Sequence, residues 1–487
     1  MALHDLTALE AAAAVRTGEV SPVELVTHAL ARADALGDLV GAFVTMTAER
    51  ALEQATEAER DVHGAFELPP FHGVPTAIKD LNLTAGVPTK LGSLAFADFV
   101  PPIDDDLVTG LRAAGTISIG KTNAPEVGLP CYTEPDPVIA PPARTPWDLT
   151  RSAGGSSGGA AAAVASGMVP IAHGSDIGGS IRVPAACCGV FGLKPSRGLN
   201  PVGPYRDQVG AGLFCENVLS RTVRDSAAML DITAGPEPGA PYPVSKPMRS
   251  YLEWLSSPDE RLCIACLARR PDGTPVAPEI EAKFQEAMML LEDMGHAVIP
   301  AQFPPEAAGE AEWGLFWMSE LALLVNERAN EIGGAPRPDE IEALSWHAVD
   351  RVRRTTALDY LKAQGQLHRA SIAMAKAFDR YDLIMTPATA DLPPRNGFIR
   401  GDDTAFDFDD WTARAYGFAP FTEIFNVTGQ PAASLPLFVS EAGLPIGIQL
   451  AGRRNEDHRL LRISHALEQA TGWSACHPPT TVALRDG

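Results

Sequence analysis

Two glycine-rich segments of the chain hold serines in settings that suit nucleophilic chemistry. Ser180 directly follows Gly178 and Gly179, and glycines without a Cβ atom let a carbonyl group approach the backbone closely. The N–H groups of Ile177, Gly178, Gly179 and Ser180 are expected to form a concave nest of donors for a negatively charged oxygen. Each such donor typically contributes roughly 3–4 kcal/mol to a transition state that carries this charge. The segment therefore predicts an acyl-transfer nucleophile, Ser180, with its own oxyanion hole.

A serine nucleophile needs a base, and the chain offers a lysine rather than a histidine for that role. None of the eleven histidines lies in a comparable setting, and the nearest in sequence, His173, belongs to the predicted strand that leads into the Ser180 turn. Lys79 ends a short apolar run at 73–78. Burial lowers the pKa of a lysine from about 10.4 toward neutrality, so that its amine can accept a proton. A second serine, Ser156, lies in the Gly-Ser run at 154–159.

Alternating helices and strands must position these residues. The segments 73–78, 116–119 and 169–172 suit buried strands, whereas 106–114 and 158–166 suit helices. Such alternation predicts an α/β fold in a single domain spanning 1–487. Its expected parts are N-terminal helices (1–65), a core with the candidate residues (66–235), a variable region on the substrate side (236–415) and a C-terminal return to the core (416–487).

The composition limits the classes of partner and the compartment. The chain has 487 residues and a formal net charge of −22, with no evident cluster of Lys and Arg, which argues against nucleic-acid binding. Seven cysteines at irregular spacing favour reduced thiols, and the first residues lack the features of a signal peptide. The most apolar stretch, 158–172, is too short to span a bilayer. We therefore expect a cytoplasmic protein that binds neither nucleic acid nor membranes.

Three segments together resemble the amidase signature family of serine hydrolases. The family's lysine matches Lys79 in Gly-Val-Pro-Thr-Ala-Ile-Lys-Asp, and its first serine matches Ser156 in Gly-Gly-Ser-Ser-Gly-Gly. Its nucleophile matches Ser180 in Asp-Ile-Gly-Gly-Ser-Ile-Arg. The resemblance covers nearly the whole chain and is weakest in the variable region. Further family-like segments lie at 120–123, 145–148, 192–195, 221–225, 426–431 and 443–447.

This resemblance implies a fold, a triad and a mechanism. The family has one α/β domain with a large mixed β-sheet flanked by helices, uses no metal or organic cofactor, and often forms homodimers. Its Ser–cis-Ser–Lys triad would make Ser180 the nucleophile, Ser156 the proton relay and Lys79 the base, with an unusual cis peptide bond in the Gly-Ser motif. The residues that would support the Ser180 turn are Ser175, Asp176 and Arg182, with the last two forming an ion pair.

The substrate is expected to be a small molecule with an amide-like bond. Trp313, Phe316 and Trp317 place three aromatic side chains within five residues, and they are candidates to line a pocket for an apolar or aryl group. The segments 172–174, 188–190 and 425–431 look closest to bacterial amidases such as the cyclic aminohexanoate-dimer (nylon oligomer) hydrolases. Such relatives suggest aryl or other xenobiotic amides, and carbamate (urethane) bonds, as substrates.

Three other functions stay open at the level of sequence. Residues 154–158 also fit the Gly-x-Ser-x-Gly nucleophile elbow, which would make Ser156 the nucleophile of an esterase with a Ser-His-Asp triad. The A subunit of a tRNA-dependent amidotransferase has the same Ser–Ser–Lys triad but works in a complex on charged tRNA. A non-catalytic binding protein could also retain this fold.

Overall fold

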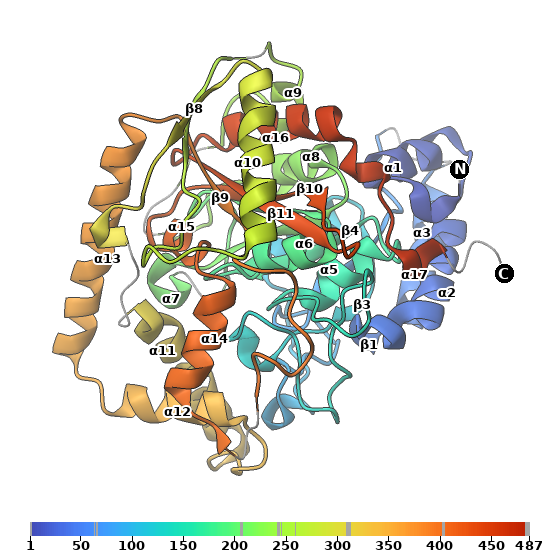
Figure 1. The fold of residues 1–487 in the computed structure, drawn as a ribbon. Helices are drawn as coiled ribbons and strands as arrows, with labels where there is room; N and C mark the ends of the chain where they lie inside the picture. The colour runs from blue at the N-terminus through green and yellow to red at the C-terminus, as the bar shows by residue number, and fades with distance from the viewer. Residues whose placement is uncertain are drawn as a thin grey trace.

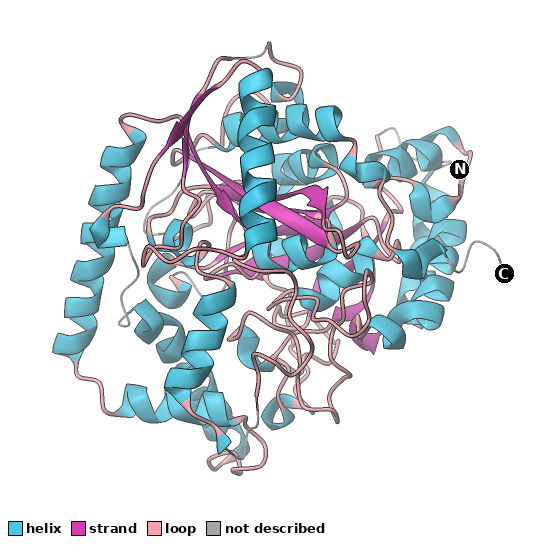
Figure 2. Ribbon diagram, in the orientation of Figure 1, coloured by secondary structure: helices cyan, strands magenta, loops and turns pink. Residues whose placement is uncertain are grey.

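The computed structural model describes residues 2–482 apart from 63, 65–66, 205–207, 241–243, 245, 259, 308–312 and 402–404. Its centre is a mixed eight-stranded sheet in the order β4-β6-β5-β10-β11-β9-β7-β8, flanked by helices (Figures 1 and 2). Strand β7 pairs in parallel with β8 and β9, and the other neighbours pair antiparallel. The strands are β4 (Ile171–Asp176), β5 (Phe191–Lys194), β6 (Cys215–Ser220), β7 (Cys263–Cys266), β8 (Ala297–Pro300), β9 (Leu383–Pro387), β10 (Ala432–Val439) and β11 (Pro445–Gly452).

The central strands are covered on both faces. Every residue of β4, β5, β6, β9 and β11 is buried, so these strands show no alternation of exposed and buried positions. Helices that segregate to the faces of such a sheet complete the core. The expected α/β fold with a large mixed sheet in one domain is thus confirmed.

A second, three-stranded sheet presents the lysine candidate. It has the order β1-β3-β2, with β3 (Ile117–Thr122) antiparallel to β1 (Phe43–Met46) and parallel to β2 (Pro75–Lys79). The N-terminal segment, expected to be helical, therefore also contributes the short strand β1. Its helices are α1 (Ala8–Thr17), α2 (Pro22–Val40) and α3 (Ala48–Val62), at the right of Figure 1.

Two helices built from small residues carry the serine segments. Helix α5 (Gly158–Ala165) follows the Gly-Ser run and is buried throughout. It packs closely because a Cβ atom on Gly159 would collide with the backbone of Ala42 and Asn123. Helix α6 (Arg182–Cys188) begins directly after the Ser180 turn and is also fully buried. The two serine segments are therefore fixed to helices in the interior of the molecule.

The remaining helices cover the outside of the sheet and one side of the serine segments. In Figure 1, α11, α12 and α14 gather at the lower left, and α13 lies along the left edge. These four helices belong to the variable region, except for the last three residues of α14. The remaining helices, apart from short 3-10 turns, are α4 (Asp106–Ala113), α7 (Val209–Gly212), α8 (Val223–Thr233), α9 (Tyr251–Trp254), α10 (Pro278–Asp293), α11 (Gly314–Ile332), α12 (Ala343–Arg353), α13 (Ala357–Phe378), α14 (Phe408–Phe418), α15 (Glu423–Val427), α16 (Asp457–Thr471) and α17 (Pro479–Val482).

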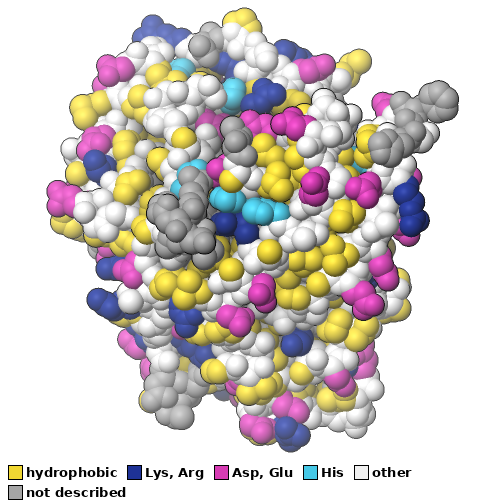
Figure 3. All heavy atoms as spheres, turned by 90° about the vertical axis from the view of Figure 1, so that its right-hand side faces the viewer, with side chains coloured by type: hydrophobic (Ala, Val, Ile, Leu, Met, Phe, Trp, Pro, Cys, Tyr) yellow, Lys and Arg dark blue, Asp and Glu magenta, His cyan; other side chains and the backbone are white. Residues whose placement is uncertain are grey.

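The surface mixes charges of both signs with apolar side chains. On the face shown in Figure 3, the described Lys and Arg side chains are scattered among Asp and Glu. Among the helices that the structure describes, none combines the length and the apolar character needed to cross a membrane.

Candidate active site

Lys79 ends strand β2 with its side chain completely buried. Its Nζ atom donates hydrogen bonds to Ser156 Oγ at 2.7 Å and to Ser175 Oγ at 2.9 Å. Burial lowers the pKa of Lys79 from 10.5 to about 7, although the carboxylates of Asp176 and Glu216 act in the opposite direction. A substantial fraction of Lys79 is therefore neutral near pH 7, and a neutral amine can accept a proton. Ser175, expected at the Ser180 turn, lies on β4 and contacts the lysine.

Ser156 lies between this lysine and helix α5. Its side chain is 1% exposed, and the peptide bond between Gly155 and Ser156 is cis. A Cβ atom on Gly155 would collide with the backbone of Tyr132, so the glycine allows the Gly-Ser run to pass close to this neighbouring segment. The Ser156 hydroxyl faces a cavity while it contacts Lys79. This position suits a group that passes a proton between the lysine and a bound molecule.

Ser180 lies in the turn between β4 and α6, and its side chain is 8% exposed. Its carbonyl accepts a hydrogen bond from Ser157 N at 3.1 Å, which joins the two serine segments. Ser180 lines two cavities that meet at this residue. Within the described part of the chain, no side chain or backbone group forms a hydrogen bond with its hydroxyl. Ser180 Oγ is therefore accessible to a bound molecule and not held by a protein partner.

The carboxylate of Asp176 organises the turn from inside. It accepts hydrogen bonds from Gly179 N at 2.8 Å and Ile181 N at 3.1 Å, and it pairs with Arg182, whose Nη2 lies 2.8 Å from Oδ1. Burial alone would raise the pKa of Asp176, but the Arg182 guanidinium and hydrogen bonds from Arg182 and Asn426 outweigh burial and hold it well below its usual range. The expected pairing of Asp176 with Arg182 is thus present.

This arrangement corrects the expected oxyanion hole. Of the four N–H groups predicted to point toward a bound oxygen, that of Gly179 is bonded to the Asp176 carboxylate. The N–H groups of Ile177, Gly178 and Ser180 have no hydrogen-bond acceptor among the residues that the structure describes. These three residues line the cavity beside Ser180. The donor set available to an oxyanion is therefore smaller than the sequence suggested, because the turn directs one N–H inward.

Arg182 connects the turn to distant parts of the chain. Its Nη1 donates to the carbonyl of Thr422 and to Gln449 Oε1, both at 2.8 Å. Asn426 accepts from Nη2 at 2.5 Å and donates to the carbonyl of Asp176 at 2.9 Å. These partners, which lie in α15, directly before it, and in β11, were not identified from the sequence, although Asn426 begins one of the family-like segments. The buried network fixes the Ser180 turn against the second half of the chain.

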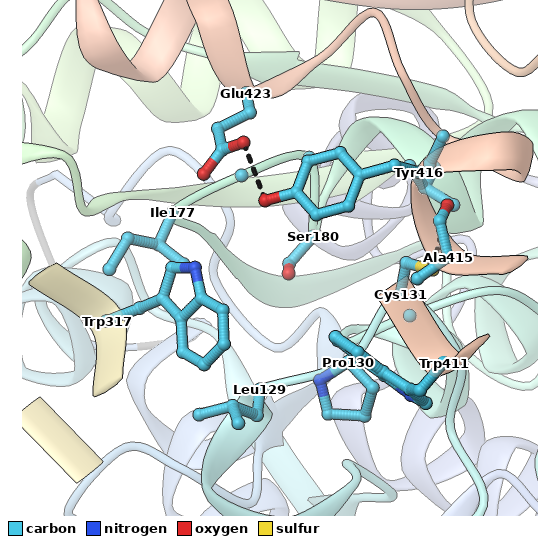
Figure 4. Close-up of a pocket in the computed structure, with 15 residues that line it drawn as sticks. Leu129, Pro130, Cys131, Ile177, Ser180, Trp317, Trp411, Ala415, Tyr416 and Glu423 are labelled. Carbon is cyan, nitrogen blue, oxygen red and sulfur yellow. Dashed lines mark hydrogen bonds between the residues drawn. The ribbon is translucent and has the colours of Figure 1, made fainter. Parts of the chain in front are cut away.

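Two cavities meet at Ser180, and the indole of Trp317 lines both. We call the first the Tyr416 cavity; Figure 4 shows its aromatic and apolar side chains around Ser180, with the Glu423 carboxyl and the Tyr416 hydroxyl at its polar side. We call the second the Ser156 cavity, because Ser156 lines it and does not line the first. Leu129, Ile177, Ser180 and Trp317 are common to both cavities.

The aromatic cluster predicted to line the pocket is divided. Only Trp317 reaches the cavities, whereas Trp313 and Phe316 are 2% and 1% exposed and belong to a hydrophobic core cluster. The expectation that all three residues line the pocket is therefore not met. Trp313, at the start of α11, packs into the core, and Phe316 faces away from the cavities because adjacent positions on a helix point in different directions. Trp411 and Tyr416, on helix α14, supply the other aromatic walls, and neither residue was identified from the sequence.

The structure argues against a histidine base. His173 is completely buried on β4, and its Nδ1 accepts a hydrogen bond from Lys79 N at 3.4 Å. Burial, with the nearby charges of Lys79 and Lys121, lowers the pKa of His173 to about 3. Among the described residues, no histidine forms a hydrogen bond with Ser156 or Ser180. The reading of residues 154–158 as the nucleophile elbow of a Ser-His-Asp esterase therefore has no histidine to support it.

Comparisons with known proteins identify the family of this chain. Residues 24–461 match the family model described as Amidase. The chain is 33% identical to the 6-aminohexanoate-cyclic-dimer hydrolase of Paenarthrobacter ureafaciens, over 95% of this chain and 94% of that protein. It is 32% identical to the acylamidase of Rhodococcus erythropolis, with 99% of each chain covered.

A solved structure of a 6-aminohexanoate cyclic dimer hydrolase complexed with substrate has the same fold. It matches with a TM-score of 0.92 and 30% sequence identity, over 98% of this chain and 99% of that chain. The family match and these relatives each extend over most of the chain. The chain therefore belongs to the amidase signature family and is a hydrolase of carbon–nitrogen bonds in amides.

Proposed function

We propose that the protein hydrolyses its substrate through an acyl-enzyme on Ser180, with Ser156 as proton relay and Lys79 as base. The observation that carries this proposal is the 2.7 Å hydrogen bond between Lys79 Nζ and Ser156 Oγ. Two further features support it: the pKa of Lys79 lies near 7, and the Ser180 hydroxyl is free of protein partners in the described structure. A serine needs such a base to become an effective nucleophile.

In the first half of the reaction, neutral Lys79 accepts the proton of Ser156, which in turn takes the proton of Ser180. Ser180 Oγ then forms a bond with the substrate carbonyl carbon, and the electron pair of the C=O bond moves to the oxygen. The N–H groups of Ile177, Gly178 and Ser180 are available to stabilise this oxyanion, each with a contribution of about 3 kcal/mol. The charge is thus held by backbone donors that are already in place.

Collapse of the tetrahedral intermediate breaks the carbon–nitrogen bond. Ser156 gives its proton to the departing nitrogen and is reprotonated by Lys79, so that the amine leaves as a neutral molecule. Water then attacks the acyl-enzyme, with its proton passing through the same two residues, and Ser180 is released with its hydroxyl restored. No metal or organic cofactor takes part in these steps.

The substrate class that we propose is a small apolar or aryl amide, or the related carbamate. Trp317, Trp411 and Tyr416 give the Tyr416 cavity aromatic walls, which suit an apolar group. Two relatives are named as a cyclic-dimer hydrolase and an acylamidase. These names support a substrate with a small-molecule amide bond rather than a peptide bond of a protein. The residues that line the two cavities include no Lys, Arg or His within the described structure, so neither cavity offers a cation for an anionic substrate.

The alternative of an amidotransferase A subunit predicts dependence on a partner subunit and on charged tRNA. No feature of the described site favours it over a small-molecule amidase. Purified protein that hydrolyses an aryl amide on its own would argue against the requirement for a complex.

The test uses a fluorophosphonate, which phosphonylates activated serines, followed by peptide mass spectrometry of the adduct. We expect the adduct on Ser180, at a rate that falls by two orders of magnitude or more in Lys79→Ala, because the base is removed. Lys362→Ala removes an exposed lysine of α13 and should label like the wild type. An adduct on Ser156, or equal labelling rates in Lys79→Ala and the wild type, would contradict the proposal.

A further inference from the structure

The two cavities at Ser180 divide the substrate between them. Under the proposed function, on which this inference rests, Ser156 delivers a proton to the departing nitrogen. Ser156 lines only the Ser156 cavity, so the amine part of the substrate lies there. The Tyr416 cavity then holds the acyl part, on the other side of the scissile bond.

The acyl side contains one carboxyl group, that of Glu423. Tyr416 donates its hydroxyl to Glu423 Oε2 at 2.9 Å, and both side chains line the cavity (Figure 4). Among the residues that the structure describes, nothing donates a hydrogen bond to the second oxygen, Oε1. No Lys, Arg or His belongs to the described lining of this cavity. One acceptor therefore faces the acyl group without a protein partner.

Glu423 lies beside the oxyanion donors, so its charge affects the stability of the oxyanion. A Cβ atom built on Gly178 would lie 3.9 Å from Cγ of Glu423, so the carboxyl stem packs beside a backbone N–H that is available to an oxyanion. A negative carboxylate there opposes a second negative charge on the substrate oxygen. A cationic or N–H group of the substrate that forms a hydrogen bond with Glu423 would reduce this electrostatic repulsion.

We propose that Glu423 is a specificity-determining residue, which selects substrates whose acyl group carries an ammonium or another N–H donor. The aromatic walls hold the apolar part of that acyl group, and Glu423 accepts the donor. Tyr416 holds the carboxyl in place from its other oxygen, to which it donates its hydroxyl at 2.9 Å. Anionic acyl groups are rejected, since they would meet a carboxylate without a compensating cation.

Two boronic acids of nearly equal shape test this selection without requiring turnover. The boron atom of 4-(aminomethyl)phenylboronic acid, or of 4-ethylphenylboronic acid, accepts an electron pair from Ser180 Oγ, while the Ser180 proton passes to Ser156 and Lys79. The aryl group of the adduct then occupies the acyl side. Each inhibition constant is measured at pH 8 from the slowing of fluorophosphonate labelling of Ser180. At this pH Glu423, with its pKa raised to about 7 by burial, is mostly ionised.

The ammonium compound should bind wild-type protein about tenfold more tightly than the ethyl compound, as expected for one charge-assisted hydrogen bond. Glu423→Gln should reduce this ratio to near one. Glu320→Gln removes a carboxylate of equal charge from the Ser156 cavity, so it should keep the ratio. Tyr416→Phe keeps the Glu423 carboxylate and should also keep the preference for the ammonium compound. Thermal melting identifies any variant that fails to fold, and the wild-type ratio stands independently of the variants.

The outcomes separate this inference from the proposed function. If the fluorophosphonate labels Ser180, three results overturn the inference alone. They are a wild-type ratio near one, a preference for the ammonium compound that persists in folded Glu423→Gln, and a failure of both compounds to protect Ser180. If the fluorophosphonate does not label Ser180 at all, the proposed function fails, and the selection by Glu423 fails with it.

Discussion

The backbone N–H of Gly179 donates a hydrogen bond to Oδ1 of Asp176 at 2.8 Å, from within the turn that carries Ser180. The carboxylate thereby draws one N–H of the turn inward. The N–H groups of Ile177, Gly178 and Ser180 stay available on the cavity side. The two adjacent glycines of the turn therefore differ in role. The N–H of Gly179 stabilises the turn, whereas the N–H of Gly178 is available to a bound molecule.

This difference predicts unequal effects of the same substitution. Gly179 has φ +135°, and a Cβ atom there would lie 2.7 Å from Cβ of Thr422, whereas the nearest atom to a Cβ on Gly178 is 3.9 Å away. Gly179→Ala should lower the free energy of unfolding by at least about 2 kcal/mol, through strain at this backbone conformation and through overpacking. Gly178→Ala should change it by less than about 0.5 kcal/mol. Urea unfolding of the two variants checks this, and equal losses would refute the assignment.

The pH dependence of catalysis should follow the proton on Lys79. Burial lowers its pKa to about 7, and only the neutral amine can accept a proton, so kcat/KM should rise with pH through a midpoint near 7. Glu216 raises the pKa of Lys79, so Glu216→Gln should move the midpoint to lower pH. Profiles between pH 5 and 9, measured with an uncharged aryl amide, report this shift.

A second group near the site titrates in the same range and needs its own control. Burial raises the pKa of Glu423 to about 7, and its ionisation, which opposes a negative charge on the substrate oxygen, changes kcat/KM over the same pH range. Glu423→Gln removes that ionisation and should leave the midpoint near 7 if Lys79 is the base. A profile that becomes flat in Glu423→Gln would assign the midpoint to the carboxyl instead.

Ser156 should matter more for amides than for activated esters. An amine needs a proton to depart, whereas a nitrophenolate leaves readily without one. In Ser156→Ala, kcat/KM for a p-nitroanilide should fall by a further factor of about 10² or more beyond the fall for the p-nitrophenyl ester of the same acyl group. Stopped-flow or steady-state assays of the matched pair measure the two losses, and losses of equal size would remove Ser156 from the proton delivery step.

The lysine and the two serines could be identified from sequence because local features mark them. Glycines that flank Ser156 and Ser180, and an apolar strand that ends at Lys79, are visible without knowledge of the fold. The 2.7 Å contact between Lys79 and Ser156 then depends on how β2 and α5 pack together. The α/β class followed from the alternation of elements, while the strand order of the large sheet depends on long-range pairing that no local pattern encodes.

The walls of the cavities could not be predicted for a related reason. Trp411, Tyr416 and Glu423, more than 230 residues from Ser180 in sequence, reach it through the packing of α14 against α6 and of α15 against the sheet. Trp313 and Phe316 fit the aromatic pattern as well as Trp317 does, but their positions around the start of α11 direct them into the core. The direction of the Gly179 N–H depends on the dihedral angles of a single turn, which composition does not determine.

The buried pair of Asp176 and Arg182 should dominate the stability of the site. Asp176→Asn leaves the Arg182 charge without its carboxylate and should cost about 3–5 kcal/mol of unfolding free energy near neutral pH. Because the folded-state pKa of Asp176 lies well below that of the unfolded chain, the wild-type carboxylate stabilises the fold above about pH 4 and loses this effect as the pH falls further. The difference between wild type and Asp176→Asn should therefore be constant from pH 5 to 8 and shrink below about pH 4. Urea unfolding across this range measures it, and a difference that grows as the pH falls would contradict the assigned ion pair.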